Sequence, residues 1–187
     1  WFTGILPFAE QGPGYDQLRF VGSHPGWTAR NAGIHNGSVF HNVNITWMVC
    51  PSSPLDAMGD TGGGKVINKP HYVGIAGATN GNGFTNKNRE QRACCNCCNN
   101  QARNAQLAAG GMLLPNECKK FASATDGTST TLVVGECSDF VRNGAGIKQA
   151  QINSHHGWLM GTPNRQKVKE GTGRFSRCFN ITTIRYP

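Results

Sequence analysis

The sequence predicts an α+β fold, built mainly of short antiparallel strands, with long Gly- and Asn-rich loops and one or two short helices. Glycine accounts for 25 of the 187 residues, hydrophobic residues for 37% and charged residues for only 15%. The apolar runs are short and turn-forming residues separate them, which is typical of many short strands rather than of long helices. At this length a single domain over residues 1–187 is expected.

A few segments are compatible with helices. An apolar segment opens the chain before the Gly12-Pro13-Gly14 break, and we expect a short helix within residues 1–20 that packs on the sheet. Residues 89–107 are rich in Ala, Gln and Arg, which favour helices, and Gly110-Gly111 would end such a helix. Residues 117–121 predict one further helical turn.

The other apolar runs predict strands, because β-branched and aromatic residues favour extended backbone. The segments of this type are 43–49, 71–76, 130–134, 157–161 and 174–186, with a brief strand or turn at 112–115. Segments rich in Gly, Asn and Pro predict the loops. These are 21–46, 51–69, 78–88, 139–153 and 163–173.

The stretch 124–137 combines a turn with a strand. Asp126 and Gly127 predict a tight turn, because a carboxylate can accept a nearby backbone N–H and glycine tolerates a positive φ. The β-branched run that follows predicts a buried strand, closed by Gly135. The alternative interpretation is a cation site formed by Asp126, Glu136 and Asp139. Chelation of calcium by Asp56 and Asp60 is a second, weaker hypothesis, since two carboxylates fall well short of an EF-hand.

The formal net charge of +8 favours acidic partners. The basic residues are scattered, however, and the densest patch is the loop 165–169. No nucleic-acid module accompanies them, so a basic surface that attracts acidic glycans, a membrane or neighbouring subunits is favoured over nucleic-acid binding. No stretch approaches the ~18 apolar residues of a membrane span.

Several blocks of the chain, taken in order, resemble one known family. Asp126-Gly127-Thr128-Ser129, continued by Gly135-Glu136, resembles a D-G-T-S-N-T-x-x-V-G-E signature in which Thr130 replaces the Asn. Further blocks that match lie at 1–11, 50–54, 72–77, 157–163 and 180–187. They are similar to blocks of the DUF1559 proteins, a pilin-like family abundant in planctomycetes, and they span nearly the whole chain.

The resemblance implies a pilin-like head domain. Family members also carry a prepilin-type leader, a long apolar N-terminal helix and often a terminal H-x9-D-G motif, which this chain does not contain. We therefore expect an exported head domain, at the cell surface or outside the cell, that reaches a membrane only through a segment outside this chain. The implied function is that of a non-enzymatic structural subunit of a pilus- or pseudopilus-like filament or surface assembly, with copies of itself as partners.

The eight cysteines form the strongest constellation in the sequence. Four are clustered, namely Cys94, Cys95, Cys97 and Cys98. The other four are dispersed along the chain, namely Cys50, Cys118, Cys137 and Cys178. Two overlapping C-x-x-C patterns would suit zinc or iron–sulfur ligation in a reducing compartment. The resemblance implies a location outside the cytosol, where cystines are expected. We therefore predict disulfides, with each clustered cysteine bonded to a dispersed one.

Two other functions stay open. A carbohydrate- or solute-binding module would present Trp27, Trp47 or Trp158 along a groove, and a thiol- or metal-dependent enzyme would hold free thiols or a metal. His155 and His156 are neighbours that would point to opposite faces of a strand, so they would not chelate one ion together. No cofactor is expected apart from structural calcium. The chain also contains three N-x-[S/T] sequons, which predict N-glycosylation only in an organism that has the enzymes for it. Their acceptor residues are Asn36, Asn44 and Asn180.

Overall fold

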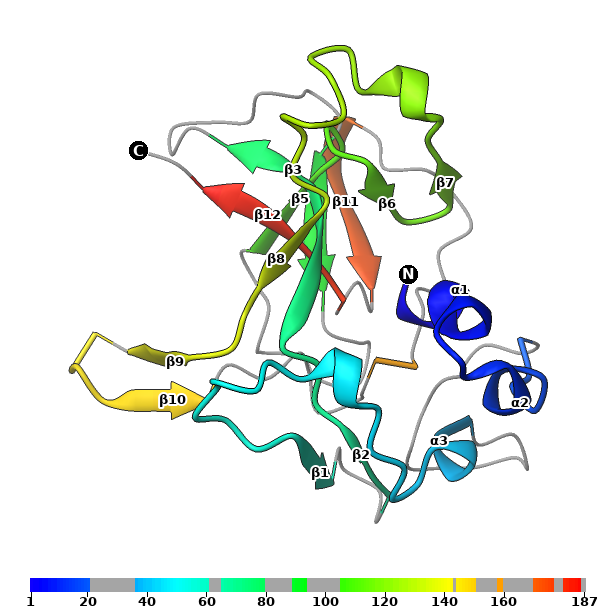
Figure 1. The fold of residues 1–187 in the computed structure, drawn as a ribbon. Helices are drawn as coiled ribbons and strands as arrows, with labels where there is room; N and C mark the ends of the chain where they lie inside the picture. The colour runs from blue at the N-terminus through cyan, green and yellow to red at the C-terminus, as the bar shows by residue number, and fades with distance from the viewer. Residues whose placement is uncertain are drawn as a thin grey trace. The chain divides into compact units, whose positions relative to one another are not determined.

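The structure is a computed structural model that describes residues 1–20, 36–60, 65–79, 89–93, 105–142, 144–150, 158–159, 170–176 and 180–185 (Figure 1). The chain divides into two compact units, and each is described by itself. The first unit comprises Trp1–Val73 and Glu136–Gly161, and the second comprises Gly74–Gly135 and Thr162–Pro187. Short helices and small sheets confirm the α+β prediction, while the pilin-like arrangement and the single domain stay predictions.

The helices described in the first unit are all short. They are α1 (Phe2–Ile5), η1 (Leu6–Phe8), α2 (Gly12–Tyr15), α3 (Asn36–Val39) and η2 (Thr46–Met48). Pro7 and Pro13 lie in the first turns of η1 and α2, where the missing N–H of proline costs nothing. The short helix predicted within residues 1–20 is confirmed, whereas the break predicted at Gly12-Pro13-Gly14 is wrong, because these residues begin α2. The prediction of extended backbone at 43–49 is wrong for η2, which is a 3₁₀ turn with its Val49 N–H bonded to the Thr46 carbonyl.

The core of the first unit gathers side chains from these helices, from the loops between them, from Ile67 and from the turn at 158–159. Aromatic rings pack edge to face at its centre, with the Trp158 ring centroid 5.2 Å from that of Phe40 and 6.2 Å from that of Phe2. Such tilted contacts add to the hydrophobic burial of the rings. The buried members of the core are Phe2, Leu6, Leu18, Phe40, Ile45, Met48, Ile67, Trp158 and Leu159.

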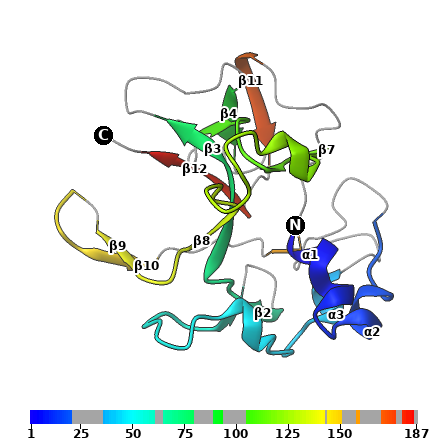
Figure 2. The same cartoon turned by 45° about the horizontal axis from the view of Figure 1, so that its top comes forward.

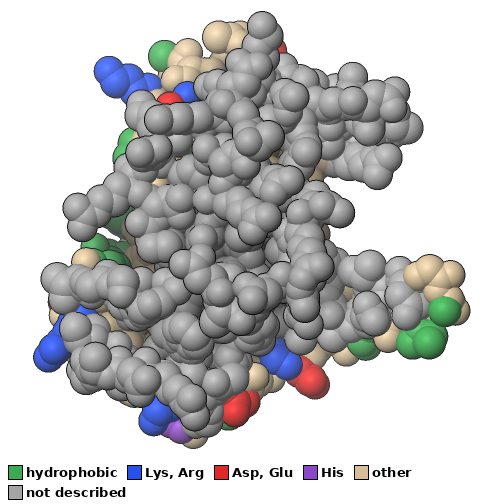
Figure 3. All heavy atoms as spheres, turned by 180° about the vertical axis from the view of Figure 1, so that it is seen from behind, with side chains coloured by type: hydrophobic (Ala, Val, Ile, Leu, Met, Phe, Trp, Pro, Cys, Tyr) green, Lys and Arg blue, Asp and Glu red, His purple; other side chains and the backbone are tan. Residues whose placement is uncertain are grey.

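Two small antiparallel hairpins complete the first unit. One pairs β1 (Met58–Asp60) with β2 (Val66–Asn68), and the other pairs β9 (Phe140–Arg142) with β10 (Lys148–Ala150). Both lie in segments predicted as loops, 51–69 and 139–153, so those predictions are wrong at these strands. Strands of three residues carry too little periodicity to stand out in a sequence. Hydrophobic side chains lie at the surface near the end of the β9–β10 hairpin, where Ile147 is 62% exposed (Figure 3).

In its described residues, the second unit contains two three-stranded sheets and a short hairpin (Figure 2). One sheet has the order β12-β3-β8, with β12 (Ile181–Arg185) parallel to β3 (Tyr72–Thr79). The other has the order β11-β4-β5, with β11 (Glu170–Ser176) parallel to β4 (Arg89–Ala93) and β5 (Ala105–Ala108) antiparallel to β4. β6 (Leu113–Leu114) and β7 (Glu117–Cys118) form the hairpin. The predicted strand at 71–76 and the brief strand at 112–115 are confirmed.

The predicted helix at 89–107 is wrong where the structure describes it, because β4 and β5 occupy its ends. Arg89 pairs with Ala108 and Arg92 pairs with Ala105 across the two strands. Leu107 and Ala108 are fully buried in this arrangement. Burial and strand pairing therefore override a helix propensity that amounts to tenths of a kcal/mol per residue. Residues 94–104 lie outside the described part of the chain.

Other boundaries also differ from the predictions. The helical turn expected at 117–121 is the strand β7 followed by the 3₁₀ helix η3 (Phe121–Ser123). Trp158 and Leu159 lie in a turn rather than in the strand expected at 157–161. β11 begins inside the basic segment 163–173 that predicted a loop, and the strand region 174–186 contains the end of β11 and all of β12.

Candidate functional site

The tight turn predicted at Gly127 is confirmed, and the hydroxyls of Thr130 and Thr131 hold it. Gly127 has a φ of +95°, and its N–H donates to the Ala124 carbonyl at 3.0 Å. The Thr130 hydroxyl donates to the Asp126 carbonyl at 2.5 Å, and the Thr131 hydroxyl donates to the Gly127 carbonyl at 2.8 Å. Hydroxyls that bond nearby carbonyls hold a turn and compete with strand formation. The threonines therefore belong to the turn and not to the strand expected at 130–134.

The strand after this turn begins later than predicted. β8 comprises Val134–Glu136, so Gly135 lies inside the strand instead of closing it. The apolar run is also not buried: Leu132 is 66% exposed, Val133 36% and Val134 39%. Phe121, in the same part of the chain, is 83% exposed. The prediction of a buried strand is thus wrong, because β8 is the edge strand of its sheet among the described residues.

The proposed calcium ligands are engaged separately. The Asp139 carboxylate accepts the N–H of Phe140 at 2.6 Å, and the Glu136 carboxylate accepts the Ser138 hydroxyl. Asp126 belongs to the second unit, whereas Glu136 and Asp139 belong to the first. Within the described ranges, no three His, Cys, Asp or Glu side chains are grouped as a metal ion requires, and this includes Asp56 and Asp60.

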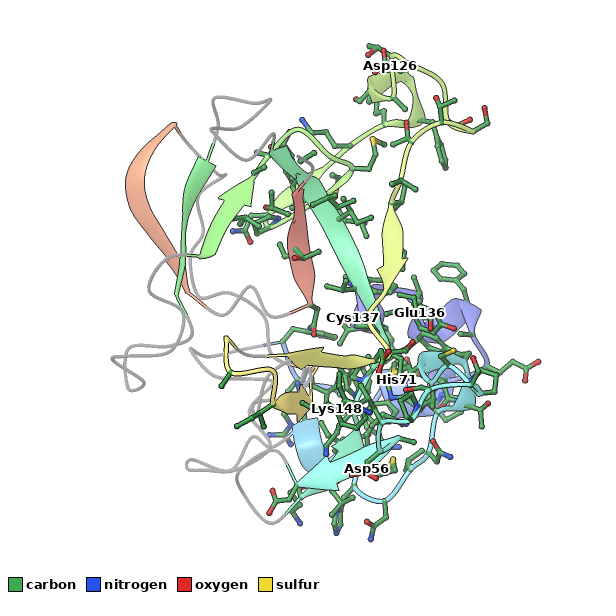
Figure 4. The ribbon with its side chains drawn as sticks, turned by 90° about the vertical axis from the view of Figure 1, so that its left-hand side faces the viewer. Asp56, His71, Asp126, Glu136, Cys137 and Lys148 are labelled. Carbon is green, nitrogen blue, oxygen red and sulfur yellow. The ribbon has the colours of Figure 1, made fainter. Side chains whose placement is uncertain are left out.

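Polar side chains from three segments meet around the buried His71 (Figure 4). The His71 side chain is 2% exposed. Its backbone N–H donates to the Met48 carbonyl at 2.8 Å, and its carbonyl accepts the Cys137 N–H at 2.6 Å. The imidazole Nδ1 accepts the backbone N–H of Cys50 at 3.1 Å. His71 therefore joins the segment that carries Cys50 to the end of β8.

The acidic and thiol groups beside His71 have shifted proton affinities. The hydrogen bond from Ser138 lowers the pKa of Glu136, and a hydrogen bond with Cys50 lowers it further. Desolvation acts in the opposite direction, and the nearby His71 adds a smaller lowering. Burial raises the pKa of the Cys137 thiol. The carboxylate is therefore held ionised and the Cys137 thiol protonated.

This arrangement does not match a Cys–His nucleophile. In such a pair the imidazole takes the proton of the thiol, whereas the Nδ1 of His71 is occupied by the backbone N–H of Cys50. The Cys50 sulfur instead lies 3.2 Å from the Ser52 hydroxyl. The cluster is organised to join segments of the chain, and its hydrogen bonds are those of a structural centre.

Most of the cysteine prediction falls outside the described residues. Cys94, Cys95, Cys97, Cys98 and Cys178 all lie there, as do His155 and His156. The three described cysteines are unbonded, with Cys50 buried, Cys118 exposed and Cys137 intermediate. The pairing of clustered with dispersed cysteines stays a prediction.

The tryptophans named for a binding groove lie in the core where they are described. Trp158 is 2% exposed, and Trp47 is partly buried against the same core. Trp27 lies outside the described residues. An exposed aromatic platform for a sugar is thus not formed by Trp47 and Trp158.

The three sequon asparagines have different surroundings. The Asn36 amide is buried and bonds both the N–H and the carbonyl of Arg19, at 2.9 and 2.8 Å. Asn180 is 9% exposed. Asn44 is exposed, and its Oδ1 accepts a hydrogen bond from Asn68. Asn44 is therefore the described sequon whose geometry best suits a glycan, while the Asn36 amide serves the fold.

Sequence reasoning missed the polar side chains that hold the first unit together. Asn68 is 1% exposed, its Oδ1 accepts the Ile45 N–H at 2.7 Å, and its Nδ2 donates to the Asn44 Oδ1 at 2.9 Å. His41 Nδ1 accepts the Val66 N–H at 3.1 Å. These residues belong to no motif, and Ile45, Asn44 and Val66 lie more than twenty residues from the side chains that they bond. The signal available in the sequence for Asn68 is its place directly after two apolar residues, Val66 and Ile67.

The edge of β8 presents backbone groups as well as apolar side chains. The Ile75 N–H donates to the Val133 carbonyl at 2.8 Å, and the Cys137 N–H donates to the His71 carbonyl. These bonds run in opposite senses along the two strands, as in an antiparallel ladder. Because inward and outward groups alternate along a strand, the N–H and carbonyl of Val134 point away from β3.

Comparison with known proteins gave one result. The model of the family described as a protein of unknown function (DUF1559), also labelled SBP_bac_10, matches residues 1–183. Neither the curated proteins nor the solved structures gave a match to the chain. No helix in the described ranges has the length and hydropathy of a membrane span.

Proposed function

The chain belongs to the DUF1559 family, and from this membership we propose that it is a non-enzymatic structural subunit of an extracellular filament or cell-surface assembly of the pilus or pseudopilus type. Copies of the chain join along the edge of β8. The observation that carries the proposal is the apolar, unprotected edge that Leu132, Val133 and Val134 form.

The chemistry of this edge favours strand addition. Soluble proteins normally guard edge strands with lysine, proline or a bulge, because outward N–H and carbonyl groups recruit other strands. The run 132–134 contains no lysine and no proline, and its side chains are β-branched or aliphatic. A strand from another copy would bond the outward groups of Val134 and cover the exposed apolar side chains.

Repetition requires a second surface on the same copy. β12 lies at the other side of the same sheet, and a contact of β8 with β12 of the next copy would be head-to-tail and would propagate as a fibre. The net charge of +8 opposes dense packing at low salt, so acidic glycans or added salt should promote assembly by screening it.

The test uses two substitutions at one residue. Val134→Pro removes the outward N–H, which the pairing of β8 with β3 does not use, and keeps an apolar side chain. Val134→Thr keeps the N–H and the β-branched shape. Light scattering and negative-stain imaging of native material should show repeating particles for the parent chain and for Val134→Thr, and monomers for Val134→Pro.

Two outcomes would reject the proposal. One is a strictly monomeric parent chain at all salt concentrations. The other is assembly of Val134→Pro to the same extent as the parent. Circular dichroism of each variant checks that the fold is kept, so that loss of assembly is not confused with unfolding.

A further inference from the structure

Among the described residues of the first unit, four side chains accept hydrogen bonds from backbone N–H groups that lie far away along the chain. Two are amides: Asn36 Oδ1 accepts from Arg19 at 2.9 Å, and Asn68 Oδ1 accepts from Ile45 at 2.7 Å. The other two are the imidazoles of His41 and His71, which accept from Val66 and Cys50, each at 3.1 Å. The amides keep their acceptor at every pH. An imidazole nitrogen loses its acceptor when it is protonated.

His71 is the histidine for which this loss matters most. Its Nδ1 accepts the Cys50 N–H, which places the ring proton on Nε2. Nε2 is buried and has no hydrogen-bond partner among the described residues. Protonation would turn Nδ1 into a donor that faces the N–H of Cys50. It would also place a positive charge on a side chain that is 2% exposed.

The titratable groups around His71 are already engaged. Glu136 accepts hydrogen bonds from Ser138 and Cys50. Cys50 contributes its thiol beside the Ser52 hydroxyl, and Cys137 contributes a half-buried thiol. Glu136 is the described carboxylate that acts electrostatically on His71, and an ion pair with it is the one competing way to hold the protonated ring.

His41 provides a contrast within the same unit. Its Nδ1 lies 3.1 Å from the N–H nitrogen of Val66 and also 3.3 Å from the Val66 carbonyl oxygen. A protonated His41 can therefore donate to that carbonyl after a small ring movement. Its ring is half-buried, and the charged residues on the elements beside it are Lys65, next to Val66, and Asp60, which pairs with Val66 across β1.

We propose that His71 is an acid-sensitive clamp, which holds the Cys50 segment when its imidazole is neutral and releases that segment when it is protonated. The bond from the Cys137 N–H goes to the backbone carbonyl of His71, so it does not depend on the protonation of the ring. Acid thus frees Cys50 and its neighbours while the end of β8 stays attached. This inference does not depend on assembly through β8.

The sign of the pH dependence follows from proton linkage. The bond from the Cys50 N–H needs an unprotonated Nδ1, so binding of a proton favours the state in which this bond is broken. The stabilisation that the clamp contributes is therefore lost as the pH falls. For one proton, the unfolding equilibrium constant rises by up to about tenfold per pH unit.

The test compares three chains. His71→Asn places an amide oxygen where Nδ1 accepts, as Asn36 and Asn68 already do, and cannot titrate. Denaturant unfolding of the parent between pH 7.5 and pH 5 should show an unfolding constant that rises at least about tenfold more than that of His71→Asn. His41→Asn is the matched control and should follow the parent.

A second measurement on the parent chain keeps the proposal testable if His71→Asn fails to fold. NMR of the imidazole nitrogens should show the Nε2–H form at neutral pH, and acidification should abolish the exchange protection factor of the Cys50 amide but not that of the Cys137 amide. Identical pH profiles for the parent and His71→Asn would overturn the clamp. So would protonation of His71 with unchanged protection at Cys50, the result expected if an ion pair with Glu136 holds the ring.

Discussion

Substitution of Gly111 by alanine should destabilise the second unit, because the backbone of Gly111 lies directly against β3. Its N–H donates to the Ala76 carbonyl at 2.8 Å. A Cβ at this position would lie 2.8 Å from the carbonyl carbon of Ala76, 2.8 Å from the carbonyl oxygen of Ile75 and 2.9 Å from the nitrogen of Gly77. All three are backbone atoms of a paired strand, which cannot turn aside as a side chain can.

The expected cost has two parts. Overpacking in a well-packed interior costs about 1–3 kcal/mol. Displacement of Gly111 also weakens its hydrogen bond to Ala76, which is worth about 1 kcal/mol. Gly111→Ala should therefore lower the free energy of unfolding by roughly 2–4 kcal/mol. For a chain of this size that is a fall in Tm of roughly 4–16 °C.

Denaturant titration followed by circular dichroism measures this difference directly. Gly4→Ala is the matched control, because Gly4 lies in α1 and its Cβ would meet nothing within 4 Å. The free energy of unfolding of Gly4→Ala should stay the same or rise by up to about 1 kcal/mol, because alanine has a higher helix propensity than glycine. If Gly111→Ala lowered the free energy of unfolding by less than about 0.5 kcal/mol, the backbone of Gly111 would not pack on β3 as described.

Three further predictions concern single residues. Gly127→Val should cost more than about 1 kcal/mol of unfolding free energy, because the φ of +95° strains a β-branched residue while its Cβ meets only ordinary contacts; unchanged stability would refute the turn geometry. Asn68→Ala should cost about 1–3 kcal/mol by leaving the Ile45 N–H buried and unpaired, and a neutral result in denaturant unfolding would contradict that role. Ser138→Ala should raise the pKa of Glu136 toward the ordinary glutamate value, measured by NMR titration of its carboxyl carbon. Since that pKa is lowered in the fold, ionised Glu136 stabilises the chain above the ordinary carboxyl range, and this stabilisation disappears as the pH falls through the folded pKa.

Local chemistry was readable from the sequence. The Asp126-Gly127 turn needs only a glycine with positive φ and hydroxyls close by in the chain, and both are present. The strand at 71–76 and the short helix near the N-terminus rest on equally local signals. The family resemblance rested on blocks of this kind, and the match over residues 1–183 supports it.

Pairing over long distances was not readable. Residues 89–93 and 105–108 have the composition of a helix, and they become strands because they pair with one another and with β11. Gly110 and Gly111 looked like a helix stop, whereas Gly111 allows close approach to β3. Hydrophobicity alone also misplaced β8, since an edge strand can leave its apolar side chains exposed.

The centre around His71 shows the same limit. Cys50, His71 and Glu136 lie far apart in the sequence. Taken alone, Cys50 predicts a disulfide and Glu136 a calcium ligand, while His71 predicts no site. Their contacts arise because the Cys50 segment and the end of β8 both bond to His71. The asparagines that brace the first unit looked like ordinary turn formers for the same reason.

Amide hydrogen exchange at Val134 tests assembly through β8 most directly. The N–H of Val134 points away from β3, so it should exchange quickly in the isolated chain and become protected in assembled particles. The Ile75 amide, which bonds the Val133 carbonyl, should be protected in both states and serves as the internal reference. Equal, fast exchange of Val134 in isolated chains and in particles would contradict assembly through this edge.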